Sequence, residues 1–163
     1  MSPSADIRID AATPDDVPLL LRLITALAEY ERMTDQVVAT EADVRAALFG
    51  DRPAAEAVIA RAGGEAVGFA LWFYNYSTFL GRQGLYLEDL FVLPEQRGRG
   101  IGRALLIHLA RVAVSRNCGR MEWSVLDWNE PAIRFYRSLG AEPMDEWTVF
   151  RVTGDALTRL AER

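Results

Sequence analysis

The sequence has only one cysteine and one histidine among its 163 residues. The lone cysteine, Cys118, cannot form an internal disulfide, and with His108 as the single histidine a Cys/His metal cluster is excluded. We therefore expect no metal cofactor. No apolar run approaches the length that spans a membrane, and residues 1–8 lack a basic segment followed by an apolar core. These absences predict a protein of the reducing cytoplasm with no membrane partner.

An excess of positive charge is also missing. The net charge of −5 argues against nucleic acid as a partner, because affinity for a phosphate backbone depends on clustered cations. The chain has no internal repeat, low-complexity segment or Ser/Gly linker. With 50% hydrophobic and 25% charged residues it is an ordinary globular sequence, long enough to bury a sizeable core. We predict one domain, residues 1–163. Cationic ligands fit its net charge better, although many acidic proteins share this balance and charge alone does not identify the ligand.

The pattern of apolar residues predicts an α/β protein. Helices are expected where a capping signal precedes helical spacing, at Thr13-Pro14-Asp15-Asp16, at Thr40-Glu41-Ala42-Asp43, over 102–115, from Asn129 to Gly140 and from Asp155. Strands are expected in the short apolar runs 7–11, 55–61, 66–76, 86–93, 121–126 and 147–152. The resulting order, β-α-α-β-β-β-α-β-α-β, implies a mixed central sheet flanked by helices on both faces.

Three glycines and two arginines occupy the turn between the predicted strand 86–93 and the predicted helix 102–115. The run reads Arg97-Gly98-Arg99-Gly100-Ile101-Gly102. A strand that turns through glycines into a helix leaves backbone N–H groups unpaired at the helix start. Glycine has no Cβ to hold a bulky anion away, and the arginines add positive charge. The turn predicts a phosphate or pyrophosphate site, although a surface loop that caps an ordinary helix explains an isolated match as well.

This turn, in this order of elements, resembles the signature Gln/Arg-x-x-Gly-x-Gly/Ala of the GCN5-related N-acetyltransferases (GNAT). Further runs resemble the diamine acetyltransferase branch of that family, namely Tyr86-Leu87-Glu88-Asp89, Val125-Leu126-Asp127-Trp128-Asn129-Glu130-Pro131 and Phe135-Tyr136. The resemblance covers nearly the whole chain. Ser77-Thr78 stands where the spermidine/spermine type tends to carry Asp-Pro, so the chain looks closer to the thialysine-acetylating type. The implied fold is the GNAT acyl-CoA N-acyltransferase fold.

The resemblance implies acetyl-CoA as co-substrate. Its pyrophosphate would bind the amides around the glycine turn, and its pantetheine arm would pair with the backbone of 90–92 like an added strand. The helix start at 129–132 would close the other side of the cofactor, or Asn129 would serve only as a helix cap. The predicted cofactor-binding residues are Leu90, Phe91, Val92, Arg97, Gly98, Arg99, Gly100, Ile101, Gly102, Arg103, Asn129, Glu130, Pro131 and Ala132.

Transfer of an acetyl group to an amine requires a base, because an alkylammonium has a pKa of about 10.4. Glu88 and Asp89 interrupt an apolar strand, and alternation would send them to opposite faces, so at least one enters a cleft or the core. The resemblance implies that Glu88 contacts the amine and helps to deprotonate it. For Asp89, a structural carboxylate held by a salt bridge or by backbone amides is an equally good explanation.

Tyr136 is the candidate general acid. It lies two helical turns after Asn129, and a phenol with a pKa of about 10 can donate to a thiolate leaving group with a pKa of about 8.5. The alternative is a core aromatic residue beside Phe135. The position of Tyr136 in the family pattern favours the acid.

Carboxylates and aromatic rings attract small cations, so the amine channel is predicted to contain several of them. The candidates are Tyr30, Glu31, Glu88, Asp89 and Glu146, with Asp145 as the alternative to Glu146 and with Glu31 alternatively a solvated charge at a helix end.

The predicted function is acetyl transfer from acetyl-CoA to the primary amine of a small cation, by direct attack in a ternary complex. The acceptor would be a diamine, a polyamine, or a lysine-like amino acid such as thialysine. A protein or peptide acetyltransferase of the same fold and a non-catalytic acyl-CoA sensor are the alternatives. The resemblance also implies a homodimer whose interface includes the last strands and helix.

Overall fold

The computed structural model describes residues 6–163, so part of the N-terminal segment considered above lies outside the described residues. The chain divides into two compact units, one that ends at Ser124 and one that runs from Val125 to Arg163. None of the helices within residues 6–163 has the length and apolar character that crossing a membrane requires.

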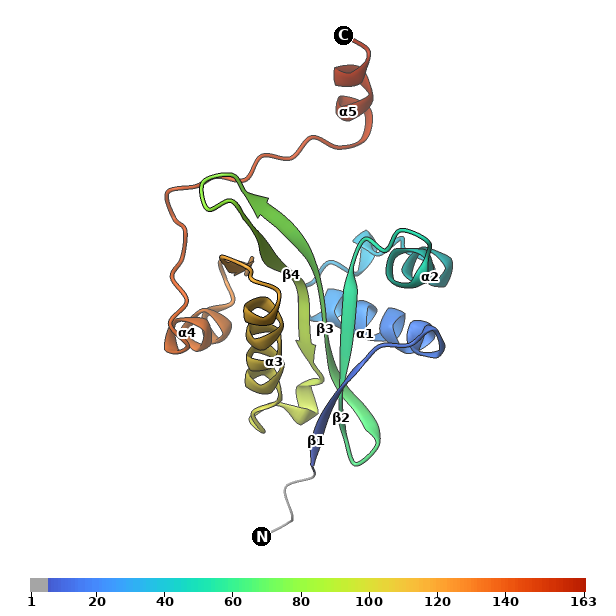
Figure 1. The fold of residues 1–163 in the computed structure, drawn as a ribbon. Coiled ribbons are helices and arrows are strands. Elements are labelled where there is room, and N and C mark those ends of the chain that lie inside the picture. The colour runs from blue at the N-terminus through green and yellow to red at the C-terminus, as the bar shows by residue number, and fades with distance from the viewer. Residues whose placement is uncertain (1–5) are drawn as a thin grey trace. The chain divides into compact units, whose positions relative to one another are not determined.

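The first unit is built on a five-stranded sheet whose strands lie side by side in chain order (Figure 1). The strands are β1 (Ile7–Ala11), β2 (Glu56–Ala62), β3 (Glu65–Ser77), β4 (Arg82–Val92) and β5 (Met121–Trp123). Strands β1 to β4 pair antiparallel, and β5 pairs parallel to β4. The predicted mixed sheet is therefore confirmed, although β5 ends at Trp123 rather than at Leu126.

Helices cover both faces of this sheet, as predicted. Helices α1 (Val17–Tyr30) and α2 (Glu41–Phe49) pack on one face and α3 (Ile101–Ser115) on the other (Figure 1). The α2 start follows its sequence signal, because the Asp43 N–H donates to Thr40 Oγ1 at 3.2 Å and the Thr40 N–H donates to Asp43 Oδ2 at 2.8 Å. Local capping chemistry thus sets where this helix begins.

The core under α1 and α2 fixes the position of β4. Val17, Leu20 and Leu23 of α1 belong to one buried cluster with Phe69 of β3 and Phe91 of β4. Phe69 and Phe91 are register partners and are 0% and 3% exposed. Since side chains alternate along a strand, Asp89 shares the α1 side of β4 with Phe91.

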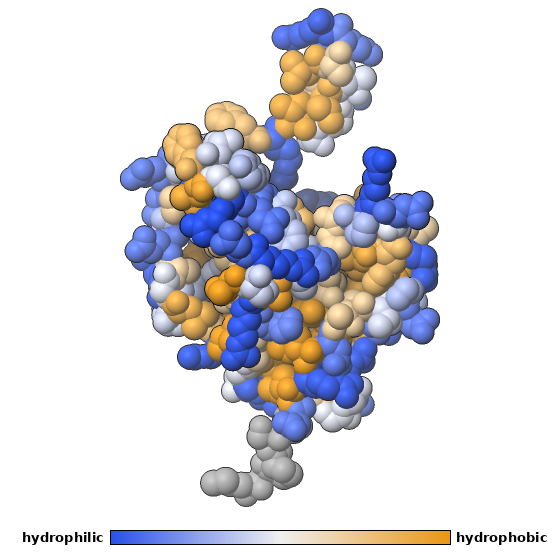
Figure 2. Space-filling view, viewed as in Figure 1, coloured by the Kyte–Doolittle hydropathy of each residue, from blue (hydrophilic) through white to orange (hydrophobic). Residues whose placement is uncertain are grey.

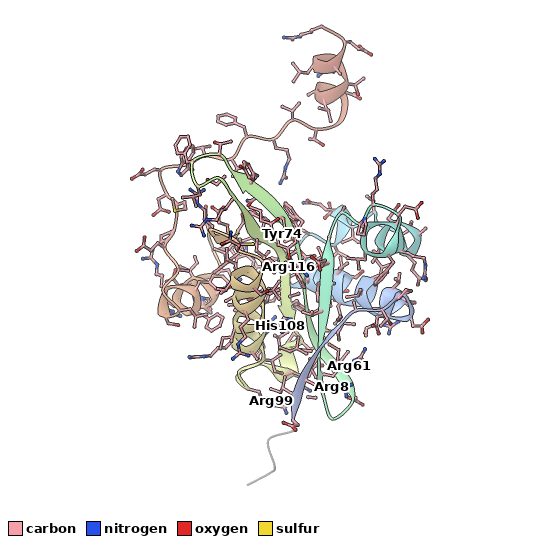
Figure 3. All side chains as sticks on the ribbon, viewed as in Figure 1. Arg8, Arg61, Tyr74, Arg99, His108 and Arg116 are labelled. Atoms are coloured by element: carbon pink, nitrogen blue, oxygen red, sulfur yellow. The ribbon has the colours of Figure 1, made fainter. Side chains whose placement is uncertain are left out.

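The far end of α3 is attached to the sheet by a polar cluster, visible where Figure 3 labels Tyr74 and Arg116. The Arg116 Nη2 group donates to Glu56 Oε1 at 3.0 Å, and Arg116 also donates to Tyr74 Oη. Trp72 Nε1 donates to the same hydroxyl at 3.2 Å. These contacts fix α3 at the end opposite its glycine turn.

The second unit contains helices α4 (Glu130–Ser138) and α5 (Gly154–Ala161). The predicted last strand, 147–152, is wrong for the described chain, because these residues belong to no strand and most are exposed. A strand requires a neighbour for its backbone N–H and C=O groups, and alternation in sequence does not supply one. The order of elements therefore ends β-α-α, while the predicted fold class stands.

Candidate active site

Strand β4 has an open edge at the residues predicted to hold the cofactor arm. The pairing of β4 with β5 covers Leu85, Tyr86 and Leu87 and ends at Trp123 of β5. The segment 89–92 continues to pair with β3 on its other side. An open edge offers N–H and C=O groups to an extended ligand, and the role of 90–92 in binding a pantetheine arm stays a prediction.

A β-bulge in β4 falls at Glu88. Asp89 is the register partner of Leu71 and Leu87 is that of Trp72, so Glu88 is the extra residue. Regular alternation, which was expected to send Glu88 and Asp89 to opposite faces, is interrupted by the bulge. The prediction from alternation is corrected at this point. The expectation that at least one acid is taken from solvent is confirmed, since Asp89 is partly buried and Glu88 is exposed.

Three carboxylates interact electrostatically beside this bulge. Burial, together with the charges of Glu88 and Glu31, raises the pKa of Asp89 from 3.8 to about 6. Burial also raises the pKa of Glu31, again with a contribution from the charge of Glu88. Three of the predicted amine-binding acids are therefore brought together. Such a cluster attracts a cation and disfavours a further anion.

The end of α1 brings Tyr30 and Glu31 to this cluster. Arg32 follows with a left-handed φ of 61°, and the Met33 N–H donates to Ala28 O at 2.8 Å, which together form a Schellman-type helix end. Tyr30 is the last residue of α1 and packs partly against the core. Tyr30 and Glu31 are both partly buried. The alternative in which Glu31 is a solvated charge at a helix end is therefore not what the structure shows.

The glycine turn has a backbone that only glycine adopts easily. Gly98 and Gly100 have φ values of 78° and 79°, in the left-handed region. A Cβ at either position would meet no other atom within 4 Å, so the space in front of the turn is open. Gly100 is the N-cap of α3 and makes no side-chain capping bond, which leaves the first amides of α3 for a ligand.

The arginines of the turn differ in their contacts. Arg99 Nη1 donates to Gln96 Oε1 within the same loop, and Figure 3 places Arg99 at the start of α3. Arg103 is exposed on the first turn of α3. Arg97 instead donates through Nε to Val92 O at 3.1 Å and lies over the Tyr30 ring. This arrangement could not be predicted from the sequence, because it joins residues that lie far apart in the chain.

The remaining predicted site residues belong to the second unit. Asn129 is the N-cap of α4, but its side chain makes no capping hydrogen bond, so the reading of Asn129 as only a helix cap lacks its expected contact. Tyr136 is half-buried, with its ring 5.7 Å from that of Phe135. Glu146 is exposed in a turn with Asp145. The roles of these residues stay predictions, as do those of Glu130, Pro131 and Ala132.

Within residues 6–163, no three His, Cys, Asp or Glu side chains form a group that could hold a metal ion. A shallow surface hollow along α1, lined by Leu21, Arg22, Thr25 and neighbouring residues, contains none of the predicted site residues. The chemistry of the first unit is therefore concentrated along β4 and its following turn.

Known proteins match this chain over most of its length. The "Acetyltransferase (GNAT) family" matches residues 22–141. The thialysine N-epsilon-acetyltransferase of Bos taurus is 40% identical over 96% of this chain and 98% of its own. The L-ornithine N5-acetyltransferase of Arabidopsis thaliana is 35% identical, covering 94% of this chain and 87% of its own.

Solved structures give the same fold. An integron cassette protein from the mobile metagenome of V. cholerae superposes with a TM-score of 0.81 at 28% identity. The match covers 96% of this chain and 98% of that one.

Proposed function

Because this chain belongs to the acetyltransferase (GNAT) family, we propose that it transfers an acetyl group from acetyl-CoA to the primary amine of a small cation. The observation that carries the proposal is the arrangement along β4. One strand leads from the acids at 88–89, through the open edge at 90–92, to the glycine turn at 97–102. A donor bound along that edge has its anionic end at the turn and its thioester toward the acids.

The reaction follows from the chemistry of the two substrates. Glu88 accepts a proton from the ammonium, directly or through water, and the free amine attacks the thioester carbonyl. The C–S bond breaks as the amide forms, and Tyr136 donates a proton to the leaving thiolate. The second proton lost by the amine nitrogen then returns to the Tyr136 phenolate, directly or through water. Both substrates are bound together in this scheme, because the amine attacks the thioester directly.

A small cationic acceptor fits better than a peptide. Glu31, Glu88 and Asp89 concentrate negative charge at the end of α1, where Glu31 directly follows Tyr30, and this charge suits a compact ammonium compound. The named relatives act on thialysine and L-ornithine, both small amino acids with a second amine. We therefore place lysine-like amino acids first and polyamines second among the acceptors of this chain.

The experiment that tests the function is a panel of acceptors assayed with acetyl-CoA. Thialysine, ornithine, lysine, putrescine, spermidine and a lysine-containing peptide are compared by their kcat/KM values. All 18 basic side chains of this protein are arginines, so its own side chains add no amine acceptor to the background. We expect the small amino acids to be used best. A preference for the peptide would favour a protein acetyltransferase, and binding of acetyl-CoA without any turnover would favour a sensor.

The glycine turn gives a direct test of cofactor binding. Gly100→Ala places a methyl group in the open space and strains a left-handed backbone by about 1–2 kcal/mol. We expect the Kd of acetyl-CoA, measured by calorimetry, to rise by about tenfold or more, because a tenfold loss requires only 1.4 kcal/mol. Gly64→Ala is the matched control, since Gly64 has a φ of 85° in the β2–β3 hairpin. Equal effects of the two variants on the Kd would show that the turn is only a connector.

We further propose that two copies of the chain associate through the arm 147–161. Apolar side chains along this arm are widely exposed, and Figure 2 shows apolar atoms at the surface of α5. They are Trp147, Val149, Phe150, Val152, Leu157 and Leu160, with exposed fractions from 49% to 91%. A second copy would supply both the missing strand neighbour and a cover for this surface.

Association can be measured by sedimentation. The unaltered chain is expected to sediment as a dimer, and the pair Trp147→Ser with Phe150→Ser is expected to dissociate it, because interface energy is concentrated in large aromatic residues. Phe79→Ser, at a 96% exposed residue of the β3–β4 hairpin, is the control. A monomeric unaltered chain would contradict the proposal.

The single-domain organisation and the compartment stay proposals. The family match spans 22–141 and so includes residues of both compact units, which supports one functional domain. The single cysteine, Cys118, favours a reducing compartment such as the cytoplasm.

A further inference from the structure

The side chain of Arg97 does not extend freely from the turn that carries it. Its Nε group donates to Val92 O at 3.1 Å, and its Cζ atom lies 4.3 Å from the centre of the Tyr30 ring. The same Cζ atom is 5.6 Å from the centre of the Phe91 ring. A planar guanidinium at these distances is attracted to the ring faces. The side chain thus joins the glycine turn, the end of β4 and the end of α1.

We propose that Arg97 is a positioning residue that holds Tyr30 at the amine end of the site, rather than a ligand of the cofactor phosphates. The inference rests on the proposed function, in which Tyr30 faces the amine. Tyr30 ends α1, and the backbone reverses at Arg32 directly after it, so its ring is not enclosed by a following helical turn. Arg97 supplies a flat surface against which that ring is fixed.

The contacts of the neighbouring arginine support this division of roles. Arg99 lies two residues further along the turn, and its Nη1 group donates to Gln96 within the same loop. Arg97 reaches a backbone carbonyl of β4 and a ring of α1 instead. An arginine that served only as a positive charge for a phosphate would need neither of these contacts. A role in positioning needs the Nε donor and the flat face, which lysine lacks.

The test compares Arg97→Lys and Arg97→Ala with Arg99→Lys. If Arg97 positions Tyr30, both Arg97 variants raise the KM for the amine by about tenfold, while the Kd of acetyl-CoA changes by less than about threefold. Arg99→Lys tests the phosphate end instead, and it is expected to act on the Kd of acetyl-CoA because Arg99 is one of the predicted cofactor-binding residues. The proposal is overturned if Arg97→Ala mainly weakens acetyl-CoA and Arg97→Lys restores its binding, because a phosphate ligand behaves in that way.

A second measurement does not depend on turnover. The free energies of unfolding of Arg97→Ala, of Tyr30→Leu and of the double variant form a double-mutant cycle. Non-additive losses show that Arg97 holds Tyr30, and additive losses overturn the proposal. If the unaltered protein acetylates no amine, the proposed function fails and this cycle alone decides the role of Arg97.

Discussion

Replacing Tyr136 with phenylalanine is expected to lower kcat by about a hundredfold or more, the usual contribution of a positioned general acid. The substitution removes one hydroxyl and keeps the ring, which lies 5.7 Å from that of Phe135 within α4. Packing is therefore preserved and the thermal midpoint should change little. The Kd of acetyl-CoA should also stay the same, because the hydroxyl acts on the thiolate that forms during reaction. Steady-state kinetics and calorimetry on the same samples measure both quantities.

Tyr76→Phe is the matched control for this prediction. Tyr76 is 66% exposed on β3, so loss of its hydroxyl should leave kcat unchanged. An unaltered kcat in Tyr136→Phe would instead support the alternative reading, in which Tyr136 is a packed aromatic residue with no part in proton transfer. A fall in kcat together with a large fall in thermal stability would point to a disturbed helix rather than to a missing acid.

The parts of the fold that depend on neighbouring residues could be predicted from the sequence. The start of α2 follows from Thr40 and Asp43, three residues apart, and the structure shows both hydrogen bonds of that capping box. The glycine turn was also evident, although the structure adds a second reason for its glycines. Gly98 and Gly100 have a left-handed backbone, which glycine adopts most easily, and the space in front of them is open.

Features that depend on pairing between distant segments could not be predicted. The bulge at Glu88 arises from the register of β4 against β3, and nothing in the run around Glu88 indicates it. The contact of Arg97 with Tyr30 joins residues 67 positions apart. The predicted strand 147–152 failed for the same reason, because a strand is defined by its partner and the sequence contains only one of the two.

Asp89→Asn is expected to stabilise the protein above pH 7 while it reduces turnover. The pKa of Asp89 is about 6 in the folded chain against an ordinary value of 3.8, so folding favours the protonated carboxyl. The protonated Asp89 carboxyl contributes its full stabilisation below about pH 4, and this stabilisation is lost as the pH rises to 6. The total loss is about 3 kcal/mol, at 1.36 kcal/mol per pKa unit. Asparagine does not ionise, so the variant avoids this loss.

Thermal unfolding between pH 4 and pH 8 measures the effect. The midpoint of Asp89→Asn should match that of the unaltered protein at pH 4 and exceed it by roughly 6–12 °C at pH 7.5, since 1 kcal/mol moves the midpoint of a domain this size by about 2–4 °C. Asp43→Asn is a control of opposite sign, because hydrogen bonds from Thr40 lower the pKa of Asp43 and its carboxylate stabilises the fold at neutral pH.

The same measurements separate the two explanations of Asp89. A structural carboxylate held by a salt bridge or by amides stabilises the fold, so its replacement would lower the midpoint at pH 7.5. If burial of the Asp89 carboxylate instead destabilises the fold, the residue is retained because it binds a ligand. Its loss should therefore raise the KM for the amine while the midpoint rises. A gain in stability with unchanged kinetics would remove Asp89 from the amine site and leave Glu31 and Glu88 as its acids.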